Sequence, residues 1–243
     1  MRSFPRSARL VRGVVVVLGL SVSIASAAVF PSLPPNLPAT ERARLGRVAD
    51  EASVATRVDT DSFVGRREVF EYLLDHPEFA AHVTRTLRLA RYRVWRTPEG
   101  LFLDDGWGAT GHFSVVHAAE GTRVIYARGA FSQMALPTVN GEAVAMIEYD
   151  VAPAADGRDL VHATVSGFVK LDSSFLALAA KIVGGIAQAK ADLEARRLMR
   201  VFARVSRAIE DDPRGVYERL RQRPDVPRRE LEEFGRVLNL HLH

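Results

Sequence analysis

Cysteine is absent from this 243-residue chain. Its absence excludes disulfide bonds, thiolate metal sites and a lipid anchor on an N-terminal cysteine. Lysine is also scarce, because Lys170, Lys181 and Lys190 are the only lysines among 33 basic residues, a bias typical of GC-rich bacterial genomes. The sequence contains no nucleophile elbow, no P-loop and no His-Glu-x-x-His zinc motif. None of the enzyme classes that these motifs mark is therefore indicated.

The first 27 residues have the organisation of a secretory signal peptide. Arginines precede a short apolar run from Gly13 to Ala25, and Ala25-Ser26-Ala27 places small residues where signal peptidase cleaves. The apolar run is shorter than the roughly 20 residues that a membrane-spanning helix needs. An uncleaved anchor is the alternative. We expect cleavage near Ala27-Ala28 and a periplasmic or secreted mature protein.

Net charge gives no indication of a nucleic-acid partner. The chain carries 33 Lys and Arg against 29 Asp and Glu. Four of these arginines and no acid lie in residues 1–27, so the mature chain has 29 residues of each sign and is formally neutral. A nucleic-acid-binding domain typically shows a basic stripe. None stands out in the sequence, and no nucleic acid is expected as a partner.

Composition divides the mature chain into three parts. Residues 28–50 begin with AVFPSLPPNLPAT, which holds four prolines and no charge, and are interpreted as a linker followed by a short helix from Thr40. Residues 51–210 are predicted to form the folded domain. Residues 211–243 are dense in Arg and Glu, so we expect a helical C-terminal extension that is mostly solvated surface.

The folded part shows strand and helix periodicities in an uncommon order: one strand, two short helices, six strands and one long helix. Clusters of Pro, Gly and Asp separate the six strands into three antiparallel hairpins. The expected elements are a strand over 53–61, helices over 66–76 and from 77, strands over 89–96, 101–107, 112–118, 123–131, 142–152 and 160–171, and a long helix from Asp172 to about Ile209. Pro213 and Pro227 are each expected to open a further short helix.

This order, and the motif VFEYLLDHPEFAAHV directly after the first strand, resemble the START-like superfamily of polyketide cyclases and lipid-transfer domains. The resemblance covers roughly residues 51–209. It implies an α+β helix-grip fold, in which a curved antiparallel sheet of about seven strands surrounds a long C-terminal helix. It also implies a hydrophobic cavity between the sheet and that helix. Because the superfamily is functionally diverse, the fold alone does not fix an activity.

Alternate strand residues would form the wall of such a cavity. The residues expected to contact an apolar ligand are Tyr92, Phe113, Ile125, Ala127, Tyr149, Ala163 and Val165 on strands, and Ile182, Gly185 and Ile186 on the long helix. The alternative is that these residues pack a filled core.

Small residues bear on that choice. Ala127, Gly129, Ala163 and Gly167 share the presumed inner phase of the strands. Gly184-Gly185 interrupts the helix that faces them, although each glycine costs a helix interior about 1 kcal/mol relative to alanine. Missing side chains at facing positions either bring backbones together or leave space for a ligand, and the sequence does not choose between them.

We therefore expect a non-catalytic carrier or sensor of a lipid or another hydrophobic small molecule, with no cofactor, no metal and no catalytic residues. One alternative is a cyclase-type enzyme, for which His162 and Tyr149 are the weak candidates. Another is an interaction module that docks through its C-terminal helices, with a transient contact to a membrane or a membrane complex. His112 and His117 are an odd number of residues apart, so they are expected on opposite faces of a strand, which argues against joint metal binding.

Overall fold

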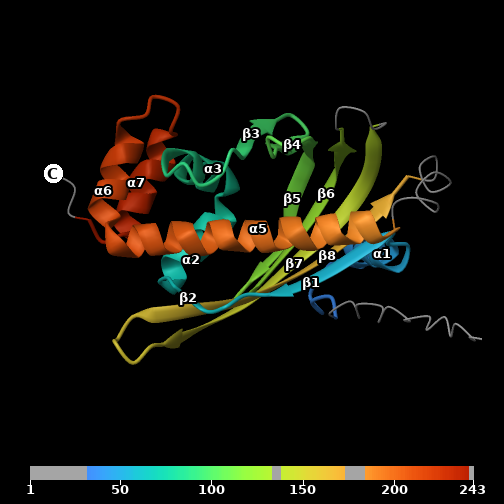
Figure 1. Ribbon diagram of the computed structural model, residues 1–243, viewed down its shortest axis with the longest axis horizontal. Coiled ribbons are helices and arrows are strands. Elements are labelled where there is room, and N and C mark those ends of the chain that lie inside the picture. The colour runs from blue at the N-terminus through green and yellow to red at the C-terminus, as the bar shows by residue number, and fades with distance from the viewer. Residues whose placement is uncertain (1–31, 133–137, 173–183, 241–243) are drawn as a thin grey trace, which may run out of the picture.

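A computed structural model describes residues 32–132, 138–172 and 184–240 of the chain. Its centre is an eight-stranded antiparallel sheet with the strand order β1-β8-β7-β6-β5-β4-β3, and the short strand β2 also pairs with β8. The sheet is curved and does not close on itself (Figure 1). The strands are β1 (Val54–Asp59), β2 (Phe63–Val64), β3 (Arg93–Thr97), β4 (Gly100–Asp104), β5 (Ala109–Ala119), β6 (Thr122–Phe131), β7 (Val139–Pro153) and β8 (Asp159–Leu171).

Six described helices surround the sheet, and the longest of them, α5, crosses in front of it (Figure 1). They are α1 (Ala39–Asp50), α2 (Arg67–Asp75), α3 (Pro77–Thr86), α5 (Gly184–Asp211), α6 (Pro213–Arg221) and α7 (Arg228–Val237). This is the predicted α+β fold, in which a curved antiparallel sheet is combined with a long helix and further C-terminal helices. The three predicted hairpins are present as β3–β4, β5–β6 and β7–β8.

The two faces of the sheet pack against different helices. On the inner face, defined by Ile147, Tyr149, Ala163 and Val165, strand side chains form a cluster with Phe70 of α2 and Met199 of α5. On the outer face, defined by Val124, Val144 and Met146, they pack against Leu45 and Val48 of α1 and against Leu37 of the preceding linker. Part of the proline-rich linker therefore contributes to the core.

The helices α2 and α3 follow directly from the sequence pattern. In α2 the buried residues Val69, Phe70, Leu73 and Leu74 recur at three- and four-residue spacing, which places them on one face. Pro77 opens α3, where its missing N–H has no helical partner to lose. The two helices cover one end of the inner face and contact the C-terminal end of α5 through Val69, Val83 and Val205.

The C-terminal helices are part of the core, and the expectation that they are mostly solvated surface is wrong. Val216 and Leu220 of α6 and Phe234 of α7 are all fully buried. They form one cluster with Leu73, Phe79, Ile209 and further residues of α2, α3 and α5. Both helices are strongly amphipathic, so their Arg and Glu residues occupy the outward face while a narrow apolar stripe packs inward. In the sequence, the many charged neighbours obscured the helical spacing of this apolar stripe.

A row of three glycines crosses the inner face. Gly111 pairs with Gly129, and Gly129 pairs with Gly141 on the next strand. A Cβ atom would lie 2.2 Å from the carbonyl oxygen of Thr110 if it were added at Gly129, and 2.5 Å from that of Arg128 if it were added at Gly111. Backbones therefore fill this space, and at Gly129 the missing side chain allows close approach rather than room for a ligand.

The long helix is described from Gly184 to Asp211. Gly184 and Gly185 stand at the start of this described stretch. The predicted long helix begins earlier, at Asp172, and residues 173–183 lie outside the described residues. The prediction that these glycines interrupt the middle of a longer helix therefore falls partly outside the described residues.

Candidate functional site

Strand register places the expected wall residues on one face of the sheet. Val115, Ile125, Ala145 and Gly167 are direct partners on four neighbouring strands. The adjacent row contains Phe113, Ala127, Ala143 and Val169. Both rows share the phase of the inner face, so the predicted alternation is confirmed.

The inner face differs between its two ends. Near α2, Tyr149, Ala163 and Val165 are buried in the cluster that includes Phe70 and Met199. In the two rows further along, the strand residues are half-buried. Those residues are mainly apolar or small, namely Phe113, Val115, Ile125, Ala127, Ala143, Ala145, Gly167 and Val169. One end of the inner face is therefore packed core, and the other is an apolar surface of low relief.

The structure divides the ten expected ligand contacts into groups. Tyr149, Ala163 and Val165 pack in the core, with Ile125 against the same cluster. Phe113 and Ala127 are half-buried partners across β5 and β6. Tyr92 packs beside the cluster of the C-terminal helices. Ile182 lies outside the described residues. Gly185 and Ile186 lie at the start of the described part of α5, and their side chains are not described.

Helix α5 lies over these half-buried rows. Thr56, which pairs with Gly167 on the inner face, donates its hydroxyl hydrogen to Asp192 of α5 with an Oγ1–Oδ1 distance of 2.5 Å. A Cβ atom added at Gly167 would meet only the Thr56 methyl group, at 3.1 Å. The contact is therefore with a side chain, unlike the backbone contacts at Gly129.

A loop between β4 and β5 borders the same surface. The loop sequence DDGWG needs glycine, since Gly106 and Gly108 have φ angles of 75° and 112°. Asp105 accepts backbone hydrogen bonds from Trp107 and Ala109 at 2.7 and 3.0 Å. The loop is therefore held in a defined turn.

Trp107 connects this loop to α5. The guanidinium carbon of Arg197 lies 3.2 Å from the centre of the indole, and Tyr92 contacts the same ring edge-on at 5.7 Å between ring centroids. Burial raises the pKa of Tyr92, so its hydroxyl stays protonated. Tyr92, Trp107 and Arg197 together form an aromatic and cationic rim beside the half-buried rows.

The two candidates for catalysis occupy other places. Tyr149 donates a hydrogen bond to Glu71 at 2.9 Å and accepts one from Arg123 at 2.9 Å. Burial, followed by the hydrogen bond to Glu71, raises the pKa of Tyr149 to about 12. His162 pairs with Asp150 and alternates with the buried Val161 and Ala163, so it lies on the outer face. The inner face therefore does not bring these two side chains together.

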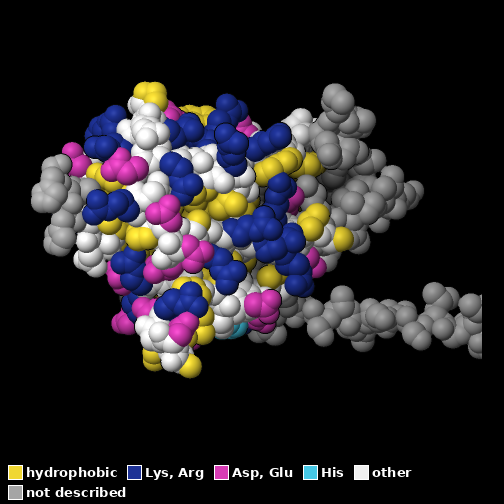
Figure 2. Space-filling view, turned by 60° about the vertical axis from the view of Figure 1, so that its left-hand side comes forward, with side chains coloured by type: hydrophobic (Ala, Val, Ile, Leu, Met, Phe, Trp, Pro, Cys, Tyr) yellow, Lys and Arg dark blue, Asp and Glu magenta, His cyan; other side chains and the backbone are white. Residues whose placement is uncertain are grey.

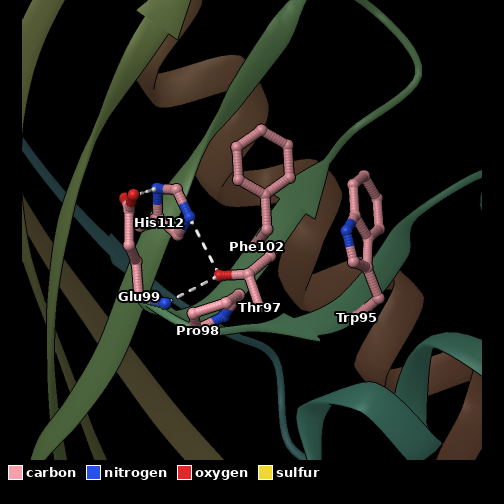
Figure 3. Close-up of a pocket in the computed structure, with 6 residues that line it drawn as sticks. All are labelled: Trp95, Thr97, Pro98, Glu99, Phe102 and His112. Atoms are coloured by element: carbon pink, nitrogen blue, oxygen red, sulfur yellow. Dashed lines mark hydrogen bonds and ion pairs between the residues drawn. The ribbon is translucent and has the colours of Figure 1, made fainter.

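A pocket lies on the outer face, at the β3–β4 hairpin and the adjoining part of β5. It has a volume of about 320 Å³ and is lined by Trp95, Thr97, Pro98, Glu99, Phe102 and His112 (Figure 3). The Trp95 and Phe102 rings lie 4.9 Å apart, and the edge of His112 meets Phe102 at 4.8 Å. His112 also contacts Thr97 Oγ1 at 3.1 Å and Glu99 at 3.6 Å. The site is small, open and aromatic, and sequence reasoning missed it because its residues meet only through strand pairing.

The expectation that His112 and His117 lie on opposite faces of a strand is wrong. A β-bulge lies between Val115 and His117. It adds one residue to the strand, so His112 pairs with Arg128 while His117 pairs with Val124, and these partners share a phase. The two histidines therefore lie on the same face, not on opposite faces. Within the described part of the chain, no three His, Asp or Glu side chains are grouped as they would be in a metal site.

Among the helices of the described ranges, none has the length and apolar character needed to span a membrane.

Comparison with known proteins gives no assignment. No protein-family model matches the chain, and no curated protein matches it. Among solved structures, the chain is similar to the 1.88 Å crystal structure of a hypothetical protein from Helicobacter pylori. The match covers 73% of this chain and 99% of the other, with 10% identity and a TM-score of 0.37. A likeness of this degree carries no argument about function.

Proposed function

We propose that this protein is an exported, START-like domain that binds a lipid or another hydrophobic small molecule non-covalently, as a carrier or sensor. The ligand would lie between the half-buried rows of the inner face and α5. The support for membership of that superfamily is the element order and the α2–α3 motif, together with the curved sheet and long helix. The signal-like N-terminus supports export.

One observation carries the proposal. At the end of the inner face remote from α2, the side chains are apolar. Four small residues on adjacent strands form a block there, namely Ala127, Ala143, Ala145 and Gly167. They remain half-buried although α5 lies above them at Asp192. Native interiors are close-packed, so an apolar surface with small side chains under a helix is suited to a guest molecule. Rim groups such as Tyr92 and Arg197 supply the few polar contacts that such sites usually contain.

The proposal assigns no catalytic step. A cyclase would need an acid or base on the inner face, and His162 lies on the other face. The Tyr149 hydroxyl already bonds with Glu71 and Arg123. Its raised pKa disfavours the phenolate that a general base would need.

The test is to enlarge one small inner-face residue. Ala145→Leu adds a side chain to the middle of the block, and the matched control Ala152→Leu makes the same change at an exposed position of the same strand. Native mass spectrometry of the purified proteins would measure a retained apolar molecule, and a fluorescent fatty-acid analogue would measure binding. We expect Ala145→Leu alone to lose both, with a melting temperature close to that of the parent. Lower stability of Ala145→Leu, without ligand in any of the proteins, would show that this surface is ordinary core.

A further inference from the structure

The solvent-facing side of α5 carries a row of arginines. Arg196, Arg200, Arg204 and Arg207, here called the arginine row, are all exposed. At 100° per residue they fall within an arc of about 80° and extend along about 16 Å of the helix. The sequence alone did not reveal the arginine row, because the same segment also contains the inward-facing residues Met199 and Val205. Figure 2 shows Lys and Arg side chains gathered at the level at which α5 crosses the molecule.

The four arginines of the row have no acidic partner among the described residues, as is also true of single arginines elsewhere such as Arg128 and Arg236. Elsewhere in the described residues arginine is commonly paired, as in Arg66–Glu210, Arg93–Asp104 and Arg223–Asp225. The neighbouring Arg197 is not part of the arginine row. Its guanidinium group stacks on Trp107 and forms an ion pair with Glu194 at 3.8 Å. No described acid forms an ion pair with any member of the row.

The spacing of the row is itself unfavourable for the isolated molecule. Arg196, Arg200 and Arg204 are neighbours at i,i+4, and like charges at this spacing destabilise a helix by about 0.2–0.5 kcal/mol per pair. An anionic partner would remove this repulsion. Guanidinium groups bind phosphate oxygens through two parallel hydrogen bonds, so a phosphate-bearing surface fits the chemistry of the row.

One further residue on the same arc decides what kind of surface fits. Leu193 lies one turn before Arg196 and its side chain is 55% exposed, the most exposed large apolar residue described. A cluster of four basic side chains on one helix face is typical of segments that bind anionic lipid headgroups, and Leu193 adds an exposed apolar side chain to this arc. Single-stranded nucleic acid would instead call for aromatic side chains on which bases stack, and the exposed arc holds none in its described part.

We infer that the outer side of α5 docks on the surface of an anionic phospholipid bilayer, with the arginine row on the phosphates and Leu193 at the acyl boundary. The inference depends on the outer side of α5 and holds whether or not the inner face binds a ligand. Docking in this orientation would bring α5, which covers the half-buried rows, directly against the bilayer.

The absence of cysteine allows a site-specific test. Leu193→Cys and the control Ala118→Cys, which is exposed on β5, would each carry one environment-sensitive fluorophore on the full chain. Vesicles of phosphatidylcholine, or of phosphatidylcholine and phosphatidylglycerol in equal parts, would then be added at low and at high salt. We expect a blue-shifted, brighter signal from position 193 alone, with anionic vesicles alone, and its loss at high salt.

Two charge variants complete the experiment. One replaces the arginine row with glutamine, and its control makes the same change in charge at Arg128, Arg214, Arg229 and Arg236, which are exposed elsewhere. Each basic side chain near an anionic leaflet contributes about 1 kcal/mol, or about fivefold in affinity, so the first variant should lose at least tenfold and the control much less. The double variant Arg200→Gln/Arg204→Gln should show an intermediate loss and guards against misfolding of the fourfold change. Equal losses in both fourfold variants, an unchanged signal at position 193, or binding to duplex DNA in preference to vesicles would overturn the inference.

Discussion

Arg123 on β6 binds both carboxylate oxygens of Asp75, the last residue of α2, with Nε–Oδ1 and Nη2–Oδ2 distances of 2.7 and 3.0 Å. The Arg123 side chain is buried, while Asp75 is partly exposed. The hydrogen bond to Asp75 is the largest cause of a raised pKa of Arg123, ahead of the opposing effect of burial. The pair fixes the end of α2 against the sheet.

Arg123→Gln is expected to lower the free energy of unfolding by about 2–4 kcal/mol, because a buried charge network loses its cation and leaves Asp75 and Tyr149 without their donor. Arg128→Gln, at an exposed position of the same strand, should change it by less than about 0.5 kcal/mol. Urea denaturation measures both. Equal midpoints for the two variants would show that the pair contributes no stability.

Gly129→Ala should destabilise the protein by about 1–3 kcal/mol, because the new Cβ would press on the backbone of Thr110 and Gly111. Gly46→Ala provides the opposite case. Gly46 lies within α1 with nothing within 4 Å of the added atom, so this change should stabilise by about 1 kcal/mol. Thermal unfolding should therefore shift in opposite directions, and a neutral Gly129→Ala would contradict the close approach of β5 and β6.

Phe234→Ala in α7 should cost about 3–5 kcal/mol, since the ring is fully buried against Tyr72 and Phe79. A chain that ends at Asp212 should lose cooperative unfolding altogether, because it would leave the apolar faces of α2 and α3 without cover. Arg236→Ala, on the exposed side of the same helix, is the control. A truncated chain with a sharp thermal transition would show that the C-terminal helices are not required for folding.

Stability is expected to fall as the pH drops below about 6.5. Nδ1 of His82 lies 2.8 Å from Arg85 Nη2 and can accept its hydrogen bond only while it is unprotonated. Burial, with the charges of Arg85 and Arg223, lowers the pKa of His82, while Asp225 opposes the shift. The unfolded state therefore binds this proton at higher pH than the folded state, and folding stability is lost as the pH passes below the unfolded value of about 6.5.

His82→Gln should flatten that part of the profile, as measured by urea denaturation from pH 8 to pH 3. A second loss should remain in the variant at lower pH. The hydrogen bond from Arg223 lowers the pKa of Asp225 to about 2. The stability that this carboxylate contributes is therefore fully present above its usual pKa of 3.8 and is lost as the pH falls toward 2. An unchanged slope near pH 6 in His82→Gln would mean that another group causes it.

The sequence predicted most elements because their signals are local. Period-two and period-3.6 apolar patterns, Pro77, and the glycine-rich loop at Trp107 act over a few residues. The apolar stripe of α7, Leu231, Phe234 and Leu238, was also present in the sequence, but its charged neighbours were given more weight. The three- and four-residue apolar spacing within α6 and α7 is the local signal that both helices pack against the core.

Other features depend on register, which no local pattern fixes. The row Gly111–Gly129–Gly141 exists only once three strands are aligned, and the outer pocket exists only once Trp95 pairs with Phe102 and Phe102 with His112. The bulge near Val115 similarly reverses the phase of half a strand. The face of each predicted ligand contact could be inferred from alternation, but its degree of packing against α2 and α5 could not.

The position of β1 determines when this chain can fold. Val54 pairs with Val169, and Asp59 pairs with Thr164. The first strand, β1, therefore pairs with the last strand, β8. The cluster around Leu73 likewise needs Phe234 from near the C-terminus. Contacts between such distant segments must overcome a large loop-closure entropy, which places folding in the millisecond-to-second range rather than the microsecond range of local helical folds. The nascent chain therefore stays without its native core until almost its whole length has been synthesised, and during that interval it remains open to chaperones, to proteases and to passage through a narrow channel.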